Sequence, residues 1–177
     1  IMEILKEGGV TAPKGFKAAS IAAEIKYKNR TDMAMVYSDV PCLAAGTFTS
    51  NVVKAACVLW DKEIVETKDF AQAVVVNSGI ANACTGKEGF DACRKTAEAV
   101  ESALGVPVDS CLVASTGVIG MQLPVDKLVK GVNGMAKILS DSKEAGSDAA
   151  KAIMTTDTIP KEMAVTFEVG GKTVTLG

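Results

Sequence analysis

Three short groups of small polar residues are the places in this sequence where side chains could take part in chemistry. The first is Ser115-Thr116-Gly117, which follows the apolar run 111–114. A strand that ends on a hydroxyl residue followed by Gly presents an O–H and a bare backbone N–H at one point, which is the geometry of an anion or oxyanion pocket. Taken alone, the same residues are more typical of a tight turn between a strand and a helix.

The other two groups carry weaker signals. Thr155-Thr156-Asp157-Thr158 places three hydroxyls and a carboxylate where a helix is expected to end, and it is typical either of a capping turn or of a substrate clamp. The segment 77–86 contains two Asn and several small residues, which can line a pocket or form an ordinary turn. Gly86-Lys87 does not fit a phosphate loop, because neither Ser nor Thr follows the Lys.

The sequence contains no histidine, which limits the chemistry that these groups can perform. Ser-His-Asp and Cys-His mechanisms, and metal sites with His ligands, are excluded unless another chain supplies the imidazole. Hydroxyls, carboxylates, lysines, backbone amides and an α-amino group remain.

The composition is that of a globular protein large enough to bury a hydrophobic core. The chain has 177 residues, 48% of them hydrophobic and 23% charged, which favours one domain. A net charge of -2 without Lys/Arg runs argues against nucleic acid or an anionic membrane as partner. Residues 1–7 lack the apolar core of a secretory signal, so we expect a cytoplasmic protein. Five cysteines without a C-x-x-C pair favour reduced thiols over disulfides or a zinc site.

The elements that must position the three groups alternate between strands and helices, which indicates a mixed α/β fold. A run rich in β-branched residues predicts a buried strand at 70–76, and a second strand leads to Thr116. Apolar stripes at helical spacing predict helices over 87–104 and from Pro124 to Leu139. Strict alternation over 163–169, followed by Gly170-Gly171, predicts a hairpin that returns through 172–176.

Other elements rest on shorter patterns. We expect strands at 21–25, 33–38 and 42–50, although 21–25 also fits a short helix, and a helical turn at 51–56. After a polar spacer at 140–146, a helix capped by Ser147 or Asp148 is expected to run through Met154. Residues 8–16 predict a surface or cleft-lining loop.

Five segments in this order carry a resemblance to one known family: 8–16 (GGVTAPKGF), 37–41 (YSDVP), 77–83 (NSGIANA), 114–120 (ASTGVIG) and 152–158 (AIMTTDT). Together they are similar to the α chain of ornithine acetyltransferase, the bifunctional glutamate N-acetyltransferase of arginine biosynthesis. Each motif is weak by itself, but the five in register cover nearly the whole chain. The resemblance implies a layered sheet-and-helix sandwich of the self-cleaving N-terminal-nucleophile type (DmpA/ornithine acetyltransferase-like). Residues 1–177 would then form a single α-chain domain, completed by an associated β chain.

The resemblance also implies an activity and its partners. Members of this family cleave themselves before a Thr, which becomes the N-terminus and the nucleophile of the β chain. That Thr takes an acetyl group from N-acetylornithine and passes it to glutamate, and some members also accept acetyl-CoA as donor. No resident cofactor or metal is implied. The expected assembly is an α2β2 heterotetramer.

Site residues follow from the same alignment. The oxyanion hole of the family is a Thr-Gly pair that aligns with Thr116 and Gly117, and its substrate-contacting Thr aligns best with Thr155, then with Thr156. An N-terminal Thr can use its own α-amino group, with a pKa of about 8, as general base, which accounts for the missing histidine. The nucleophile and a substrate-contacting Lys of the family are expected beyond Gly177, and Lys172 is not assigned in their place.

Two other interpretations stay open from the sequence. An aminopeptidase or amidohydrolase with the same kind of nucleophile would hand its acyl group to water. This half of the protein barely separates hydrolysis from transfer, because the exclusion of water depends on how the pocket closes. The third interpretation is a non-catalytic domain that binds an amino acid through the same loops and has no partner chain.

Overall fold

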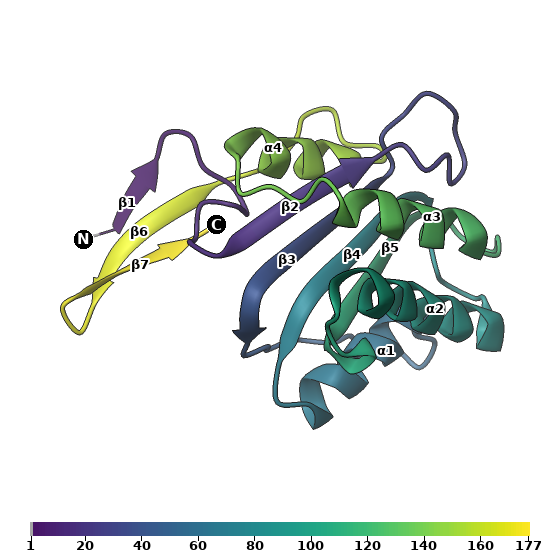
Figure 1. The fold of residues 1–177 in the computed structure, drawn as a ribbon. Coiled ribbons are helices and arrows are strands. Elements are labelled where there is room, and N and C mark those ends of the chain that lie inside the picture. Colours follow the sequence, from purple (N-terminus) through teal and green to yellow (C-terminus); the bar gives the residue numbers. More distant parts are fainter. Residues whose placement is uncertain (1) are drawn as a thin grey trace.

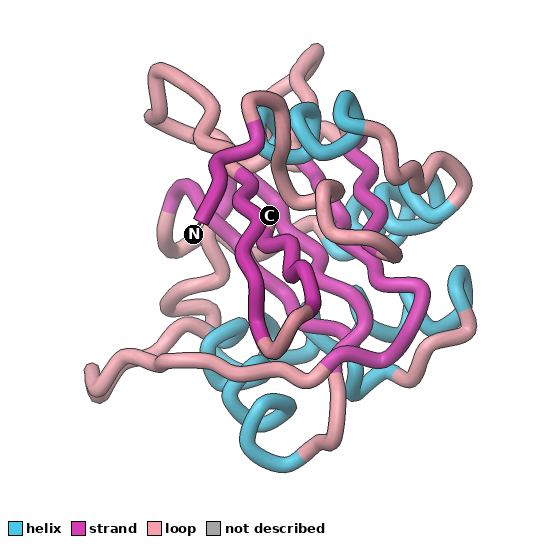
Figure 2. The backbone as a smooth tube through the Cα atoms, turned by 90° about the vertical axis from the view of Figure 1, so that its left-hand side faces the viewer, coloured by secondary structure: helices cyan, strands magenta, loops and turns pink. Residues whose placement is uncertain are grey.

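The computed structural model describes residues 2–177, which form two β-sheets and four α-helices (Figure 1). The larger sheet has the strand order β2-β3-β4-β5 and the smaller one the order β1-β6-β7. The smaller sheet projects from one side of the molecule, and both chain ends lie there (Figures 1 and 2). The strands of the larger sheet are β2 (Phe16–Ile21), β3 (Met33–Cys42), β4 (Ala71–Ile80) and β5 (Cys111–Val118).

The strand that carries Thr116 is held by a parallel pairing. β5 pairs with β4 in parallel, so that Thr116 lies opposite Ser78 and Gly117 opposite Gly79, whereas the other two pairings of this sheet are antiparallel. A parallel pair needs a crossover, and α2 (Gly86–Leu104) supplies it. This helix ends at Gly105, whose φ of 72° is left-handed. The strand, the helix and its C-terminal Gly were all predicted from the sequence, and the structure confirms them.

Helices cover both faces of the larger sheet. Together, α2 and α3 (Val125–Ala136) bury one face, where Met33 and Met35 are fully enclosed. On the other face, α4 (Lys143–Ala152) packs against β2 and β3 over Ala18 and Ala34. Strand alternation places four half-buried apolar side chains of β4 and β5 on this second face: Val74, Val76, Leu112 and Ala114. The helix therefore covers only the β2–β3 half of that face.

The free edge of β5 is satisfied by α1 (Ala56–Thr67). Trp60 Nε1 donates to the Cys111 carbonyl at 2.9 Å, and the Val113 N–H donates to Asp61 Oδ1 at 2.9 Å. In a strand, the N–H and C=O of one residue point to the same side of the strand, and those of the next residue point to the opposite side. Residues 111, 113, 115 and 117 therefore turn their backbone groups to this edge. Side chains of α1, which begins at Ala56, contact the backbone groups of residues 111 and 113. Gly117, the last of these four edge-facing residues, is exposed.

The strand predicted at 42–50 and the helical turn predicted at 51–56 are wrong. Between Cys42 and Ala56 no strand or helix occurs, so neither the strand at 42–50 nor the helical turn at 51–56 exists; β3 instead continues through Cys42. Alternation in sequence makes a strand only where another strand is available to pair with, and this segment leaves the sheet: Leu43 is 94% and Val52 96% exposed.

The strand expected at 21–25 is wrong for a different reason. β2 ends at Ile21 because the buried carboxylate of Asp32 accepts the backbone N–H groups of Ala23 at 2.8 Å and Ile25 at 2.6 Å. These bonds, with a positive φ of 56° at Glu24, fold residues 22–31 into a loop.

Three boundaries also differ from the prediction. Residues 77–80 belong to β4 rather than to a loop. The last helix begins at Lys143, because Ser142, not Ser147 or Asp148, caps it by accepting the Ala145 N–H at 3.2 Å. The predicted helix after Pro124 is confirmed but ends at Ala136.

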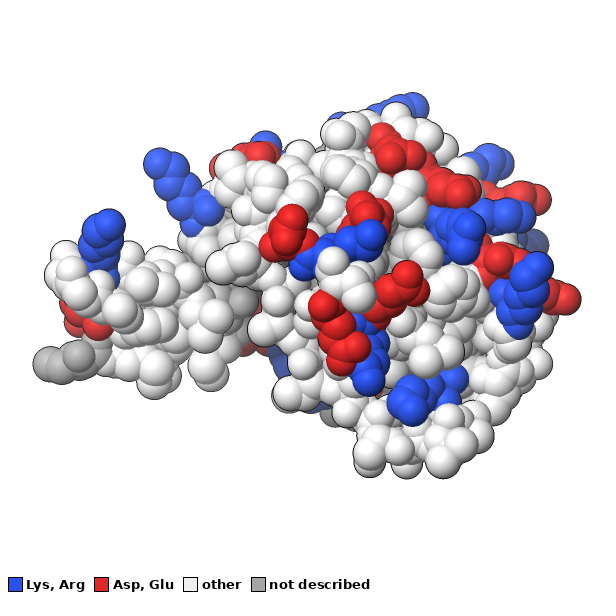
Figure 3. Space-filling model, turned by 90° about the horizontal axis from the view of Figure 1, so that it is seen from below, with Lys and Arg blue, Asp and Glu red and all other residues white. Residues whose placement is uncertain are grey.

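The smaller sheet contains the predicted hairpin. β6 (Ala164–Val169) and β7 (Lys172–Leu176) are joined by Gly170 and Gly171, both with positive φ, as a tight two-residue turn requires. β1 (Met2–Leu5), which was not predicted, adds to the other side of β6. On the face in Figure 3, acidic and basic side chains are interspersed over the body of the molecule. None of the helices in the described part of the chain is long and apolar enough to cross a membrane.

The Asp61 contact gives a testable pH dependence. Burial raises the pKa of Asp61 to about 6, opposed by its bond from Val113, so the folded state holds this proton more tightly than the unfolded state. The stability it contributes is complete at low pH and is lost as the pH rises through 6. We expect Asp61→Asn, whose amide oxygen still accepts the Val113 N–H, to be more stable than wild type by about 1 kcal/mol at pH 7.5, after allowing for partial exposure. At pH 3, below the ordinary pKa of 3.8, the two should be nearly equal.

Urea unfolding at both pH values measures this difference. Glu63→Gln, on the exposed side of the same helix, is the matched control and should show no such pH-dependent gain. An Asp61→Asn variant that is less stable than wild type at both pH values would contradict the assignment.

Candidate functional site

Four residues singled out in the sequence share one cavity. Thr116 and Gly117 at the end of β5, and Thr155 and Thr156 after α4, line a cavity of about 600 Å³. Its other lining residues are Tyr27, Arg30, Gly79 and Val118. Thr116 and Thr155 are half-buried, whereas Gly117 and Thr156 are exposed. The corner at the end of β5 is therefore open to an incoming group.

Two glycines allow the two strand ends to come together at the cavity wall. Gly79 has a φ of 105° and Gly117 a φ of 136°, a conformation that L side chains rarely adopt. A Cβ on Gly117 would lie 2.3 Å from the carbonyl carbon and 2.4 Å from the carbonyl oxygen of Gly79. The clash is with backbone atoms, so no side-chain movement relieves it. Gly117 thus requires glycine for two independent reasons.

The end of β5 offers two hydrogen-bond donors. The Thr116 side chain lies on the second face of the sheet, in the row of Leu112 and Ala114, and Thr116 lines the cavity. The Gly117 N–H turns to the edge of the sheet by strand alternation, beyond the residues whose backbone groups α1 side chains contact. A side-chain O–H and an adjacent backbone N–H at one open corner can bind the oxygen of a tetrahedral intermediate.

Buried Ser78 links the turn that carries Thr155 and Thr156 to the strand pair that carries Thr116. Ser78 lies opposite Thr116 in the parallel pair, and its Oγ donates to the carbonyl of Ala152, the last residue of α4, at 2.7 Å. The turn that carries Thr155 is therefore tied to the neighbouring strand of Thr116. Residues 74 positions apart in sequence meet through this bond.

The loop at 22–31 adds Tyr27 and Arg30, which sequence reasoning missed. The Arg30 guanidinium donates through Nη2 to the Met154 carbonyl, and the Ser78 N–H donates to the Asp32 carbonyl at 2.9 Å. Both bonds fasten the loop beside Gly79. No local sequence signal marks either residue, because they reach the site through contacts with distant segments.

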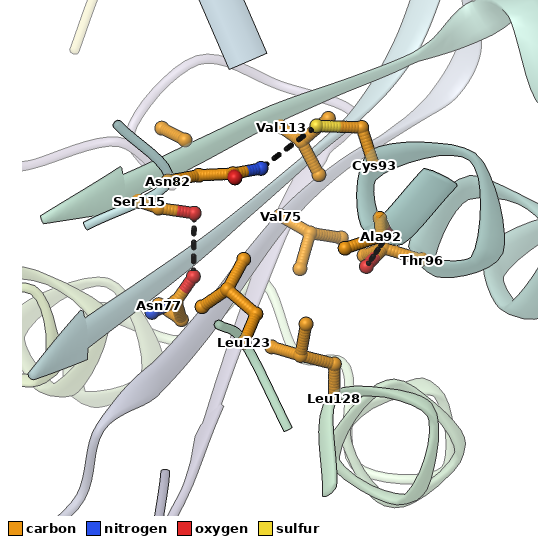
Figure 4. A pocket seen from close by; sticks show the side chains of 11 residues that line it. Val75, Asn77, Asn82, Ala92, Cys93, Thr96, Val113, Ser115, Leu123 and Leu128 are labelled. Carbon is orange, nitrogen blue, oxygen red and sulfur yellow. Dashed lines mark hydrogen bonds between the residues drawn. The ribbon is translucent and has the colours of Figure 1, made fainter. Parts of the chain in front are cut away.

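The third polar group, at 77–86, contributes Gly79 to this cavity, but its two Asn side chains lie apart from it. Asn77 and Asn82 are buried and line a separate interior cavity of about 10 Å³ (Figure 4). Ser115 Oγ donates to Asn77 Oδ1 at 2.7 Å, and Asn82 Nδ2 donates to the Gly89 carbonyl at 2.8 Å. These amides hold the end of β4 and the start of α2, so the two Asn side chains are structural.

Among the described residues of the cavity wall, none is an Asp, Glu, Cys or Lys side chain that could act as the general base. Burial raises the pKa of Cys93 and of Cys111 to about 12, which leaves both thiols protonated. Within residues 2–177 no cluster of Cys, Asp and Glu is arranged to hold a metal ion. The cavity therefore presents donors that stabilise negative charge.

Comparison with known proteins agrees with the resemblance found in the sequence. The model of the ArgJ family matches residues 17–177. The arginine biosynthesis bifunctional protein ArgJ of Symbiobacterium thermophilum is 50% identical over 172 residues, which cover 96% of this chain and 42% of that protein. The corresponding protein of Gloeobacter violaceus is 49% identical over 173 residues, 97% of this chain and 42% of that protein. The chain spans less than half the length of these curated relatives.

Solved structures show the same fold. The crystal structure of ArgJ from Bacillus halodurans superposes with a TM-score of 0.93 at 36% identity, covering 99% of this chain and 91% of that one. Ornithine acetyltransferase of Mycobacterium tuberculosis, solved in complex with ornithine, gives a TM-score of 0.91 at 44% identity, covering 99% and 93%. These likenesses confirm the layered α/β sandwich of the ornithine acetyltransferase type. Fold, family model and relatives agree that the chain belongs to the ArgJ family.

Proposed function

We propose that this chain is the α subunit of an acetyltransferase that moves an acetyl group from N-acetylornithine to glutamate in arginine biosynthesis. The observation that carries the proposal is the single cavity shared by Thr116, Gly117 and Thr155. In this role Thr116 Oγ and the Gly117 N–H stabilise the oxyanion, and Thr155, with Thr156 beside it, contacts the substrate. The proposal requires no resident cofactor and treats acetyl-CoA as an alternative acetyl donor.

The reaction needs a nucleophile and a base that the cavity wall lacks, and we assign both to a β chain. The N-terminal Thr of that chain attacks the acetyl carbonyl carbon of N-acetylornithine, and its own α-amino group takes the hydroxyl proton. The C–N bond then breaks, the proton passes to the departing amine, and ornithine leaves an acetyl-Thr ester. The amine of glutamate attacks this ester, N-acetylglutamate leaves, and Thr regains its proton.

The second face of the larger sheet supports this division between two chains. Its β4–β5 half carries half-buried apolar side chains in a row that leads to Thr116. A β chain that packs on this half would bury those side chains and reach the cavity with its N-terminus. The relatives are also more than twice as long as the matched region, since it makes up 42% of their length. We infer an α2β2 assembly of residues 1–177 as one α-chain domain with this partner.

The direct test is acetyl transfer by the complete protein. With acetyl-labelled N-acetylornithine and saturating glutamate, we expect ornithine and labelled N-acetylglutamate to form in equal amounts. Acetate release that outpaces transfer would instead identify a hydrolase. No product of either kind from a protein that retains a Thr-initiated partner chain would contradict catalysis at this site.

Thr116→Ala tests the role of the hydroxyl. Loss of one oxyanion donor should lower kcat about 100- to 1,000-fold, whereas the free energy of unfolding should change by less than about 1 kcal/mol, because a half-buried hydroxyl near the end of a strand contributes little to stability. Thr116→Ser keeps the donor and should retain most of the activity. Unchanged turnover together with a lowered melting temperature would make Thr116 a structural residue only.

Ser78→Ala tests how the two hydroxyl groups are held together. The Ala152 carbonyl loses its donor, so we expect a loss of stability of about 1–3 kcal/mol and a several-fold higher KM for N-acetylornithine, because Thr155 is less well fixed. Thr96→Ala, which removes a buried hydroxyl within α2, is the control and should cost stability without changing KM. Equal KM values for the two variants would contradict the positioning role of Ser78.

A further inference from the structure

Of the described residues that line the cavity, Arg30 is the charged one, and the reaction as written gives it no task. The remaining wall consists of hydroxyls, glycines, Tyr27 and Val118. A permanent positive charge in such a cavity attracts an anionic group of the bound molecule. The question is whether Arg30 is held in a position to do so.

The backbone on both sides of Arg30 is fixed. Asp32, two residues on, is 3% exposed, and its carboxylate accepts the N–H groups of Ala23 and Ile25 across the loop. Its carbonyl accepts the Ser78 N–H at 2.9 Å, which joins the loop to β4 beside the cavity. The loop therefore forms a rigid rim rather than a free arm.

The guanidinium itself is anchored but not saturated. One N–H of Nη2 donates to the Met154 carbonyl, at the start of the turn that carries Thr155. A guanidinium has five N–H donors, so up to four remain for a ligand. None of the ion pairs formed among residues 2–177 includes Arg30, and no Asp or Glu is part of the described cavity wall. Arg30 is thus half-buried, oriented and not neutralised by a carboxylate of this chain.

We propose that Arg30 binds the α-carboxylate of the acetyl donor and of the amino acid that accepts the acetyl group. The inference rests on the proposed function and adds a substrate contact to it. In N-acetylornithine the carboxylate carbon is three bonds from the acetyl carbonyl carbon, so the two groups must bind within a few ångströms of each other. Arg30 and Thr116 line the same cavity of about 600 Å³, so one molecule bound there can contact both.

This assignment gives the site a basis for selectivity. Both partners in the transfer carry a carboxylate next to the nitrogen that loses or gains the acetyl group. A donor without that carboxylate leaves the guanidinium desolvated and unpaired, and a binding site discriminates strongly against such a molecule. Arg30 would therefore select N-acetylated α-amino acids over simple N-acetylamines.

A purely structural role for Arg30 makes a different prediction. If its only task is the bond to the Met154 carbonyl, a variant would displace Thr155 and impair every donor alike. If it binds the carboxylate, the loss depends on whether the donor has one. Comparison of two donors separates these roles within one set of proteins.

The experiment uses the complete protein with the variants Arg30→Gln, Arg30→Lys and Lys28→Gln. Lys28 is an exposed cation of the same loop that is not part of the cavity wall, so it controls for loop charge. Acetyl transfer to glutamate is measured with N-acetylornithine and with N-acetylputrescine, which lacks only the carboxylate, each at a fixed glutamate concentration. Thermal melting of each variant checks that it is folded.

We expect Arg30→Gln to lower kcat/KM for N-acetylornithine about 10- to 100-fold, mainly through KM, and to change it less than about threefold for N-acetylputrescine. Arg30→Lys should fall in between, and Lys28→Gln should resemble wild type with both donors. Equal losses with both donors, or no loss with either, would overturn the inference. Wild-type protein that transfers no acetyl group from N-acetylornithine would contradict the proposed function itself.

Discussion

At the open end of the parallel pair, the β4 and β5 backbones approach so closely that Gly117 leaves no room for a Cβ atom against the Gly79 carbonyl. In the register of this pair Thr116 lies opposite Ser78. Because Ser78 also donates to the carbonyl of Ala152, the same strand pair is tied to the end of α4 and to the turn that carries Thr155. The geometry of the cavity is therefore set by backbone pairing and by buried hydrogen bonds rather than by flexible side chains.

The edge of β5 shows how the fold satisfies a strand without closing the site. An exposed edge presents unpaired backbone groups, and α1 contacts them through the side chains of Trp60 and Asp61. The Cys57 thiol, also on α1, forms a hydrogen bond with the backbone of Ser115, the next edge-facing residue. Burial raises the pKa of this thiol, and the hydrogen bond opposes the shift. Gly117, the next edge-facing residue, lies beyond these contacts and is exposed. An open backbone donor next to a hydroxyl is what an oxyanion site needs.

Local patterns predicted the elements whose signals are local. The stripe after Pro124, the Gly105 terminus of α2 and the Gly170-Gly171 turn each depend on neighbouring residues, and the structure confirms them. The strands expected at 21–25 and 42–50 do not form, because strand formation depends on distant partners. The buried Asp32 carboxylate accepts the N–H groups of Ala23 and Ile25. The segment 43–50 has no neighbouring strand in the sheet. Thr116, Gly117, Thr155 and Thr156 were found through motifs. Arg30 was not, because it meets Met154 across 124 residues.

We infer that the end of β5 stabilises the oxygen of the acetyl carbonyl during transfer. A crystal structure of the complete protein trapped as its acetyl-enzyme tests this most directly. We expect the carbonyl oxygen of the acetyl group to lie about 2.7–3.1 Å from both Thr116 Oγ and the Gly117 nitrogen. An acetyl-enzyme whose carbonyl oxygen points away from this corner, with the Thr116 hydroxyl bonded elsewhere in the protein, would contradict the account.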